Sequence, residues 1–238
     1  MKQLFSLLLL CCMNLVSAQR VESPTGTLAL TFQLTPDGQP TYAVSYKNKP
    51  VVLSSALGVS LKDKTALVNH FEVTGTTTHA VNETWKPVLG EQAQIVNHYN
   101  ELIVALVQKD SKVKLNLVFR AFDEGVAFRY DFPKQENLNY FIISDEKTEF
   151  NLTENNKVLW IPGDFDSNEY VYNETKFSEI DNEKLNLNNG IGVKSIPGKY
   201  TVQTPLQMKS PSGLYLNIFE AAVVNYPVMH LDANVQKY

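Results

Sequence analysis

The sequence predicts an all-β protein, built as a large two-sheet β-sandwich. Short segments rich in Val, Leu, Tyr, Phe and Thr recur along the chain between turn residues, which is typical of antiparallel strands. No Pro/Gly/Ser-rich linker or repeat interrupts them. Many short antiparallel strands in one chain bury their apolar faces by stacking two sheets about 10 Å apart.

Two hairpins are the clearest predicted elements. The first pairs residues 27–34 with 41–46 across the turn sequence PDGQP, and KNKP at 47–50 makes the next turn. The second pairs residues 102–107 with 113–119 across a polar turn, with apolar residues at alternate positions. The other expected strands are residues 51–53, 58–62, 126–132, 140–143, 157–161 and 200–208, with loops over 163–199 and one or two helical turns near 176–180.

The first eighteen residues predict a secretory signal peptide. Lys2 supplies the positive start, residues 4–10 the apolar core, and Ala18 a small residue before cleavage. Both cysteines of the chain, Cys11 and Cys12, fall inside this leader, and lipidation at Cys11 is an alternative interpretation. We therefore expect an exported, periplasmic protein cleaved after Ala18, whose residues 19–238 form one β-sandwich domain.

Charge and motifs exclude several classes of function. The chain carries 21 basic and 25 acidic residues, and the leader removes one of the lysines, which argues against nucleic acid as a partner. The leader's apolar run is too short to span a bilayer. Neither GxSxG, HExxH, a P-loop nor an EF-hand loop occurs, and the four histidines lack the spacing of a zinc site. No residue is predicted to be catalytic.

Glu220 is the most informative single residue. It lies within GLYLNIFEAAVVNYPVMHL, residues 213–231, whose pattern predicts an apolar strand with Leu214, Leu216, Ile218 and Glu220 on one face. An unpaired ionised carboxylate costs several kcal/mol to bury. Glu220 therefore needs a cation, a hydrogen-bond network or a metal ion, or else it becomes protonated. The two interpretations are a structural partner such as an Arg or Lys, and a metal or substrate role.

Trp160 and Tyr170 are candidate carbohydrate-contacting residues. They belong to WIPGDFDSNEY, residues 160–170, where aromatic side chains alternate with carboxylates and amides. Such a mixture suits a surface that contacts sugar or another domain. The alternative is a strand end whose tryptophan packs in the core before a polar loop.

Several motifs together resemble the N-terminal domain of glycoside hydrolase family 97, the bacterial α-glucosidases and α-galactosidases. Together they cover almost the whole predicted mature chain, and the most specific is GLYLNIFEAAVVNYPVMHL. They are SPTGTLALTFQL, YKNKPVV, ETWKPVLGE, NHYNEL, FRAFDEGVAFRYDFP, LNYFIISDE, WIPGDFDSNEY and GLYLNIFEAAVVNYPVMHL.

The resemblance implies a galactose-mutarotase-like β-supersandwich that precedes a catalytic (β/α)8 barrel and a small C-terminal β domain. It also implies that Glu220, in the position of the family's metal-binding glutamate, ligates an active-site calcium ion alongside glutamates of the barrel. The family's acid and its base or nucleophile lie on that barrel, so the resemblance places no catalytic residue in this chain.

Three hypotheses remain open. In the first, the chain is the N-terminal domain of an exported α-glycosidase that packs on a barrel missing from this sequence, gives Glu220 to calcium, helps enclose an oligosaccharide and is inactive alone. In the second, it is a free-standing periplasmic carbohydrate-binding sandwich that uses Trp160 and Tyr170 as an exposed platform. The third, mutarotase-like catalysis, follows from fold analogy alone.

Overall fold

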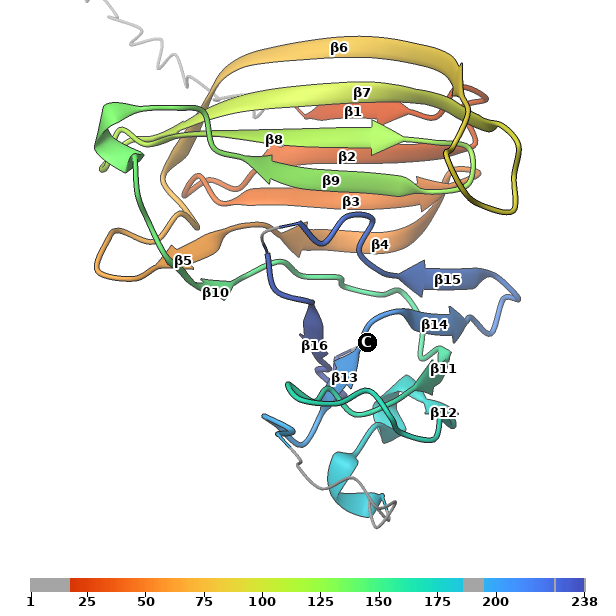
Figure 1. The fold of residues 1–238 in the computed structure, drawn as a ribbon. Coiled ribbons are helices and arrows are strands. Elements are labelled where there is room, and N and C mark those ends of the chain that lie inside the picture. The colour runs from red at the N-terminus through yellow and green to blue at the C-terminus, as the bar shows by residue number, and fades with distance from the viewer. Residues whose placement is uncertain (1–17, 186–194, 225, 238) are drawn as a thin grey trace, which may run out of the picture. The chain divides into compact units, whose positions relative to one another are not determined.

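A computed structural model of the chain describes residues 18–185, 195–224 and 226–237. The predicted leader lies outside the described residues apart from Ala18. The strands (Figure 1) are β1 Gln19–Glu22, β2 Leu28–Leu34, β3 Pro40–Tyr46, β4 Lys49–Ala56, β5 Val59–Leu61, β6 Phe71–Trp85, β7 Ile95–Gln108, β8 Lys114–Ala121, β9 Val126–Asp131, β10 Ile143–Glu146, β11 Lys157–Trp160, β12 Asn173–Lys176, β13 Thr201–Gln203, β14 Leu206–Lys209, β15 Tyr215–Ile218 and β16 His230–Asp232. Three single turns of 3-10 helix are η1 Glu136–Leu138, η2 Phe177–Glu179 and η3 Asn182–Lys184.

The chain divides into two compact units, one ending at Phe150 and the other beginning at Asn151. Each has its own cluster of buried apolar side chains. No helix of the described residues is long and apolar enough to cross a membrane.

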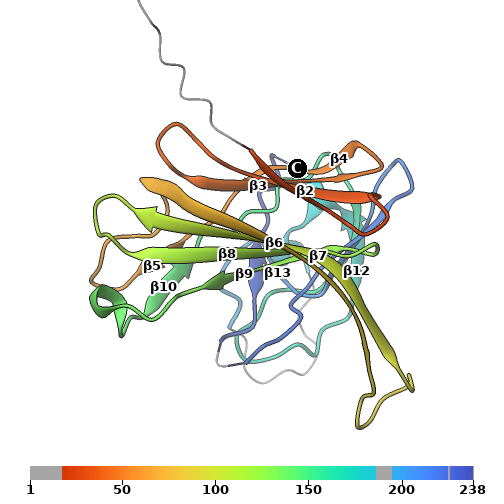
Figure 2. The same cartoon turned by 90° about the horizontal axis from the view of Figure 1, so that it is seen from above.

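The first unit is a sandwich of two four-stranded antiparallel sheets, as the sequence predicts. Their orders are β1-β2-β3-β4 and β6-β7-β8-β9 (Figures 1 and 2). Alternate residues of both sheets point into one core, where the Phe32 and Phe119 rings lie 5.8 Å apart and the Tyr42 and Phe128 rings 5.2 Å apart. Phe32 and Phe119 are fully buried, so apolar burial between the sheets stabilises this unit.

The predicted first hairpin and the turn after it are confirmed. β2 pairs with β3 over the whole length of both strands, and β3 turns into β4 with Tyr46 opposite Lys49. The two residues between them, Lys47 and Asn48, have φ of 49° and 62°, as a type I′ turn requires.

Strand β6 is an element that the sequence analysis did not predict. Of its fifteen residues only Phe71 is buried, so it lacks the alternating apolar signal of a half-buried strand. It pairs with β7 as far as Trp85 opposite Ile95, whereas β7 pairs with β8 only from Asn100 onward. The end of the hairpin is thus a two-stranded ribbon, which projects from the sheet in Figure 2.

Strands β5 and β10 form a separate two-stranded sheet of the first unit, with Leu61 opposite Ile143. The strand predicted at residues 140–143 begins only at its last residue. Residues 140–142 are therefore free of strand geometry and line a surface cavity instead.

The second unit holds a four-stranded sheet of order β12-β11-β14-β15 and the pair β13-β16. Its core includes Val158, Ile180 and Val202. The helical turn predicted near residues 176–180 is confirmed as η2, but β12 occupies a segment predicted to be loop. β14 and β15 form the hairpin predicted around the turn at 209–213.

Candidate functional site

Glu220 lies two residues beyond the end of β15. The predicted alternation holds up to this point, because Leu214, Leu216, Ile218 and Glu220 are half-buried while the residues between them are exposed. The prediction that the strand continues past Glu220 is wrong. The chain leaves strand geometry at Phe219, since Ile218 pairs with Leu206, the first residue of β14, and no residue of that strand lies beyond it.

A backbone amide holds the Glu220 carboxylate. The N–H of Met229 donates a hydrogen bond of 2.9 Å to Oε2, and this bond joins the two ends of the segment between β15 and β16. The nine ion pairs found among the described residues do not include Glu220. Its partner is therefore a main-chain donor, and no Arg or Lys of the described residues forms an ion pair with it.

Exposed apolar residues flank Glu220 in the sequence. Phe219, Val223, Val224 and Val228 all show about half or more of their surface to solvent. Apolar side chains grouped in this way mark a surface that another molecule or domain covers. Glu220 therefore lies within the sequence span of a candidate interaction surface.

Glu220 fits calcium as one ligand among several. Its carboxylate is a hard oxygen donor of the kind that calcium prefers, and the Met229 amide limits its motion. Calcium takes 6 to 8 oxygen ligands, and one carboxylate supplies at most two. No group of three or more His, Cys, Asp or Glu residues in the described ranges could hold a metal ion. A calcium site here would therefore need ligands from elsewhere.

Trp160 is a core residue, which corrects its predicted role as part of an exposed platform. Its side chain is 1% exposed and packs among the apolar residues of the second unit. The indole N–H donates to Thr175 Oγ1 at 3.0 Å, which ties β11 to β12. A ring enclosed by protein cannot stack on a sugar, so the core-packing alternative describes Trp160.

Tyr170 is also buried, at 8% exposure, and it has a structural partner. Its hydroxyl donates a 2.5 Å hydrogen bond to Asp164 Oδ2. Oδ1 of Asp164 accepts from the backbone N–H groups of Asp166 and Ser167, and Oδ2 also accepts from that of Ser195. The polar half of WIPGDFDSNEY is thus a loop organised around the Asp164 carboxylate, and Tyr170 too offers no exposed platform.

The two partners titrate in opposite directions. Burial alone would raise the pKa of Asp164, but the hydrogen bonds from Tyr170 and from the backbone outweigh it and hold the pKa below its usual value. Burial and the neighbouring Asp164 carboxylate raise the pKa of Tyr170 to about 12. Asp164 remains ionised and Tyr170 neutral over the physiological range, which preserves the hydrogen bond.

Sequence reasoning missed a second apolar surface at the end of the β6–β7 hairpin. Val88 and Leu89 are 99% and 89% exposed, and Trp85 and Val96 on the adjoining strands are also exposed. The motif ETWKPVLGE contained the only signal, an apolar run inside a turn. Two-stranded ribbons are marginally stable in isolation, so a projecting ribbon with an apolar end is suited to a partner surface.

Fold and site together define the chain as a large antiparallel β-sandwich protein whose described residues carry one candidate metal-ligand carboxylate rather than a complete metal site. The family described as "Glycosyl-hydrolase 97 N-terminal" matches residues 21–238. The chain therefore belongs to glycoside hydrolase family 97 and corresponds to the N-terminal domain of its enzymes.

Similar proteins agree with this assignment. The chain is 24% identical over 250 aligned residues to a retaining α-galactosidase of Bacteroides thetaiotaomicron, covering 98% of this chain and 34% of that protein. It is 31% identical to a family 97 enzyme of Pseudoalteromonas sp. strain K8, solved with panose and with acarbose. The TM-scores are 0.75 and 0.76, with 90% of this chain and 30% of that enzyme covered.

A β-arabinopyranosidase at 20% identity and a TM-score of 0.71 shares the fold, over 86% of this chain and 32% of its own. The chain thus spans about a third of the length of each of these relatives.

Proposed function

We propose that this chain serves as the N-terminal domain of an exported α-glycosidase, of the α-glucosidase or α-galactosidase type. It packs on a catalytic (β/α)8 barrel and supplies Glu220 to an active-site calcium ion. The observation that carries the proposal is the position of Glu220, which is half-buried, held by the Met229 amide and followed by exposed apolar residues. A carboxylate placed in this way is oriented before a partner arrives.

The length of the relatives supports an active site whose residues come from two parts of one enzyme. Roughly two thirds of the retaining α-galactosidase and of the Pseudoalteromonas enzyme have no counterpart in this chain. The residues that carry out glycoside hydrolysis would lie in that part, so the chain alone should not hydrolyse glycosides. In the complete enzyme it would help to enclose the oligosaccharide.

Two apolar surfaces would meet the rest of the enzyme. One is the segment from Phe219 to Val228, and the other is the hairpin end with Val88 and Leu89. Burial of such side chains at an interface contributes roughly 25 cal/mol per Å² of apolar area. The partner proposed for both is the portion that the relatives possess beyond the aligned third.

Glu220 is the residue of this chain that would hold the calcium ion. The Met229 N–H fixes the direction of one carboxylate oxygen, and Met229 directly precedes β16, whose pairing with β13 positions that amide. A bound calcium ion would polarise a substrate oxygen as a Lewis acid. Export to the periplasm, through the predicted leader, completes the proposal.

A chimera tests the shared calcium site. Residues 19–238 of this chain would replace the N-terminal third of the Pseudoalteromonas enzyme, and calcium affinity would be measured by calorimetry. We expect Glu220→Gln to weaken calcium binding about 10-fold or more, because the substitution removes a charged ligand. Glu124→Gln, in an exposed turn of the first unit, is the matched control and should leave the affinity unchanged.

Two results would contradict the proposal. One is a folded chimera whose calcium affinity does not respond to Glu220→Gln. The other is submicromolar calcium binding by the isolated chain, because one carboxylate with water cannot provide such affinity. The second measurement does not depend on the chimera, so a chimera that fails to fold leaves the proposal testable.

The structure does not provide the exposed aromatic platform that was predicted for a free-standing carbohydrate-binding module. Trp160 and Tyr170 are both buried. Carbohydrate binding by this chain would therefore need another exposed aromatic residue.

A further inference from the structure

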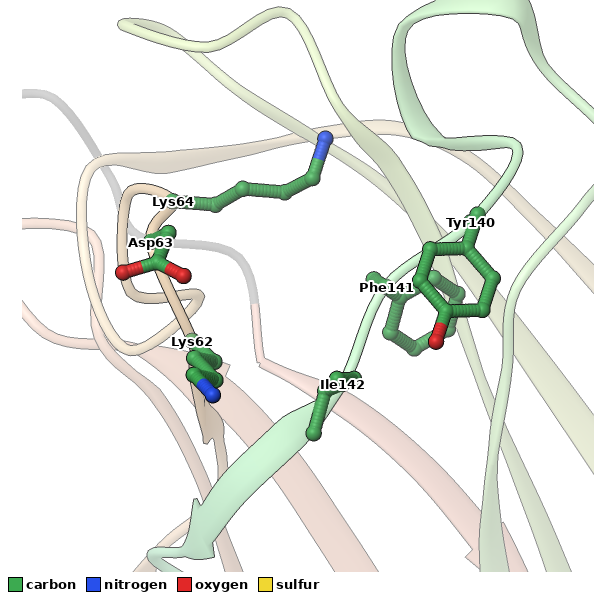
Figure 3. A pocket seen from close by; sticks show the side chains of 6 residues that line it. All are labelled: Lys62, Asp63, Lys64, Tyr140, Phe141 and Ile142. Atoms are coloured by element: carbon green, nitrogen blue, oxygen red, sulfur yellow. The ribbon is translucent and has the colours of Figure 1, made fainter.

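We propose that a surface cavity of the first unit, between residues 62–64 and residues 140–142, binds one pyranose unit of an oligosaccharide, with the ring of Tyr140 as its stacking face. The cavity is lined by Lys62, Asp63, Lys64, Tyr140, Phe141 and Ile142 (Figure 3). The choice of a sugar as ligand rests on the proposed glycosidase function, whereas the site itself is independent of Glu220.

The backbone holds the two walls of this cavity together. The N–H of Lys62 donates to the carbonyl of Ile142 at 2.9 Å, and Leu61 pairs with Ile143 immediately beyond. On the Tyr140 side, the Phe141 ring packs on that of Phe132 with centroids 4.7 Å apart. The walls are thus fixed by a small sheet and an aromatic contact, which lowers the ordering cost of binding.

Tyr140 offers an exposed aromatic face at the edge of a hollow. Its side chain is 74% exposed. Two other exposed aromatic residues are already engaged, since Lys209 lies over the Tyr215 ring at 5.0 Å and Phe165 contacts His230 with ring centroids 5.5 Å apart. An apolar ring face beside polar groups suits the C–H face and the hydroxyls of a sugar.

The opposite wall supplies hydrogen-bonding groups. In Figure 3, Lys64 extends across toward the side of Tyr140, Lys62 is seen nearly end-on, and Asp63 lies between the two lysines. Within the part of the chain that the structure describes, these three side chains take part in no ion pair or side-chain hydrogen bond. Two ammonium donors and a carboxylate acceptor can together satisfy neighbouring sugar hydroxyls.

The size of the cavity limits what it can hold. Its volume is about 250 Å³, below the roughly 300–1,000 Å³ of pockets that enclose a drug-sized ligand. It therefore accommodates one sugar unit, and the remaining units of the chain extend into solvent. A small open site of this kind is expected to bind with a Kd of about 1 mM.

Heteronuclear NMR titration of the isolated chain tests this site. The probes are panose, an α-galactobiose and cellotriose, and the signals followed are the amides of residues 62–64 and 140–142. At least one probe should shift these amides, and Tyr140→Ala should weaken its binding 10-fold or more. Tyr140→Phe keeps the stacking face and should retain most of the affinity.

Tyr172→Ala provides the matched control, because Tyr172 is an exposed tyrosine of the second unit and should not affect binding. The proposal is overturned if none of the probes shifts these amides, or if Tyr140→Ala binds as well as the unaltered chain. Neither result bears on the calcium affinity of the chimera, so failure of this site and failure of the proposed function are distinguishable.

Discussion

The Tyr170 hydroxyl and the Asp164 carboxylate form a buried 2.5 Å hydrogen bond that organises the loop after β11. The bond joins a neutral donor to an ionised acceptor, and such charge-assisted bonds are stronger than bonds between neutral groups. Three backbone amides complete the shell around Asp164. This arrangement accounts for a polar motif that the sequence alone presents as a ligand-binding surface.

Tyr170→Phe should destabilise the second unit by about 1.5–3 kcal/mol, because the substitution removes a hydrogen bond to a charged group inside the fold. The two tryptophans of the chain are Trp85, on the exposed hairpin, and Trp160, in the core of the second unit. Urea unfolding followed by fluorescence in a Trp85→Phe background therefore reports on the second unit. An unchanged midpoint would show that the bond contributes nothing.

The stability of the second unit should fall at both extremes of pH. The pKa of Asp164 is lowered by folding, so its contribution is present above the ordinary value of 3.8 and is lost as the pH falls through the lower folded value. The pKa of Tyr170 is raised from 10 to about 12, so its contribution is complete below pH 10 and is lost between 10 and about 12.

The same fluorescence measurement, made as a function of pH, checks both limits. In Tyr170→Phe the alkaline loss should become shallower because the titrating hydroxyl is gone. The acid loss should become smaller and be complete at a higher pH, because Asp164 has lost a donor that stabilised its ionised form and its folded pKa lies closer to the unfolded value. Acid and alkaline limits that match those of the unaltered chain would be inconsistent with this coupling.

Trp160→Ala should destabilise the second unit by about 3–5 kcal/mol, the usual cost of truncating a buried aromatic residue. The indole donor to Thr175 is lost as well. The matched control is Trp85→Ala on the exposed hairpin end, where a change within about 0.5 kcal/mol is expected in the isolated chain. Circular dichroism during thermal unfolding would measure both, and equal effects would argue against a core role for Trp160.

Gly38→Ala should destabilise the first unit by about 1–3 kcal/mol. Gly38 has φ of +78°, and an added Cβ would lie 2.6 Å from the backbone nitrogen of Phe71 and 2.7 Å from its carbonyl oxygen. Neither backbone atom can move without disturbing the start of β6, whose first amide bonds to the Gly38 carbonyl. Gly75→Ala meets no atom within 4 Å and is the control. Equal unfolding temperatures of the two variants would refute this explanation.

The strands with clear alternation were predictable, and β6 shows where that prediction ends. β2, β3, β7 and β8 each bury one side, so their apolar residues recur at every second position. β6 buries only its first residue and is held by pairing with β7, a neighbour fixed by hydrogen bonds rather than by side-chain pattern. Its sequence therefore resembles a polar loop.

The candidate site was likewise only partly predictable from the sequence. The sequence by itself determined the all-β class, the sandwich, the family and the face on which Glu220 lies, because alternation and motif spacing are local properties of the chain. Only the tertiary structure decided that Trp160 and Tyr170 are enclosed and that Met229 is the partner of Glu220. It also brought Tyr140 and Lys62 to one cavity. Burial and pairing depend on segments far apart in sequence, and a local pattern contains no information about which segment packs against it.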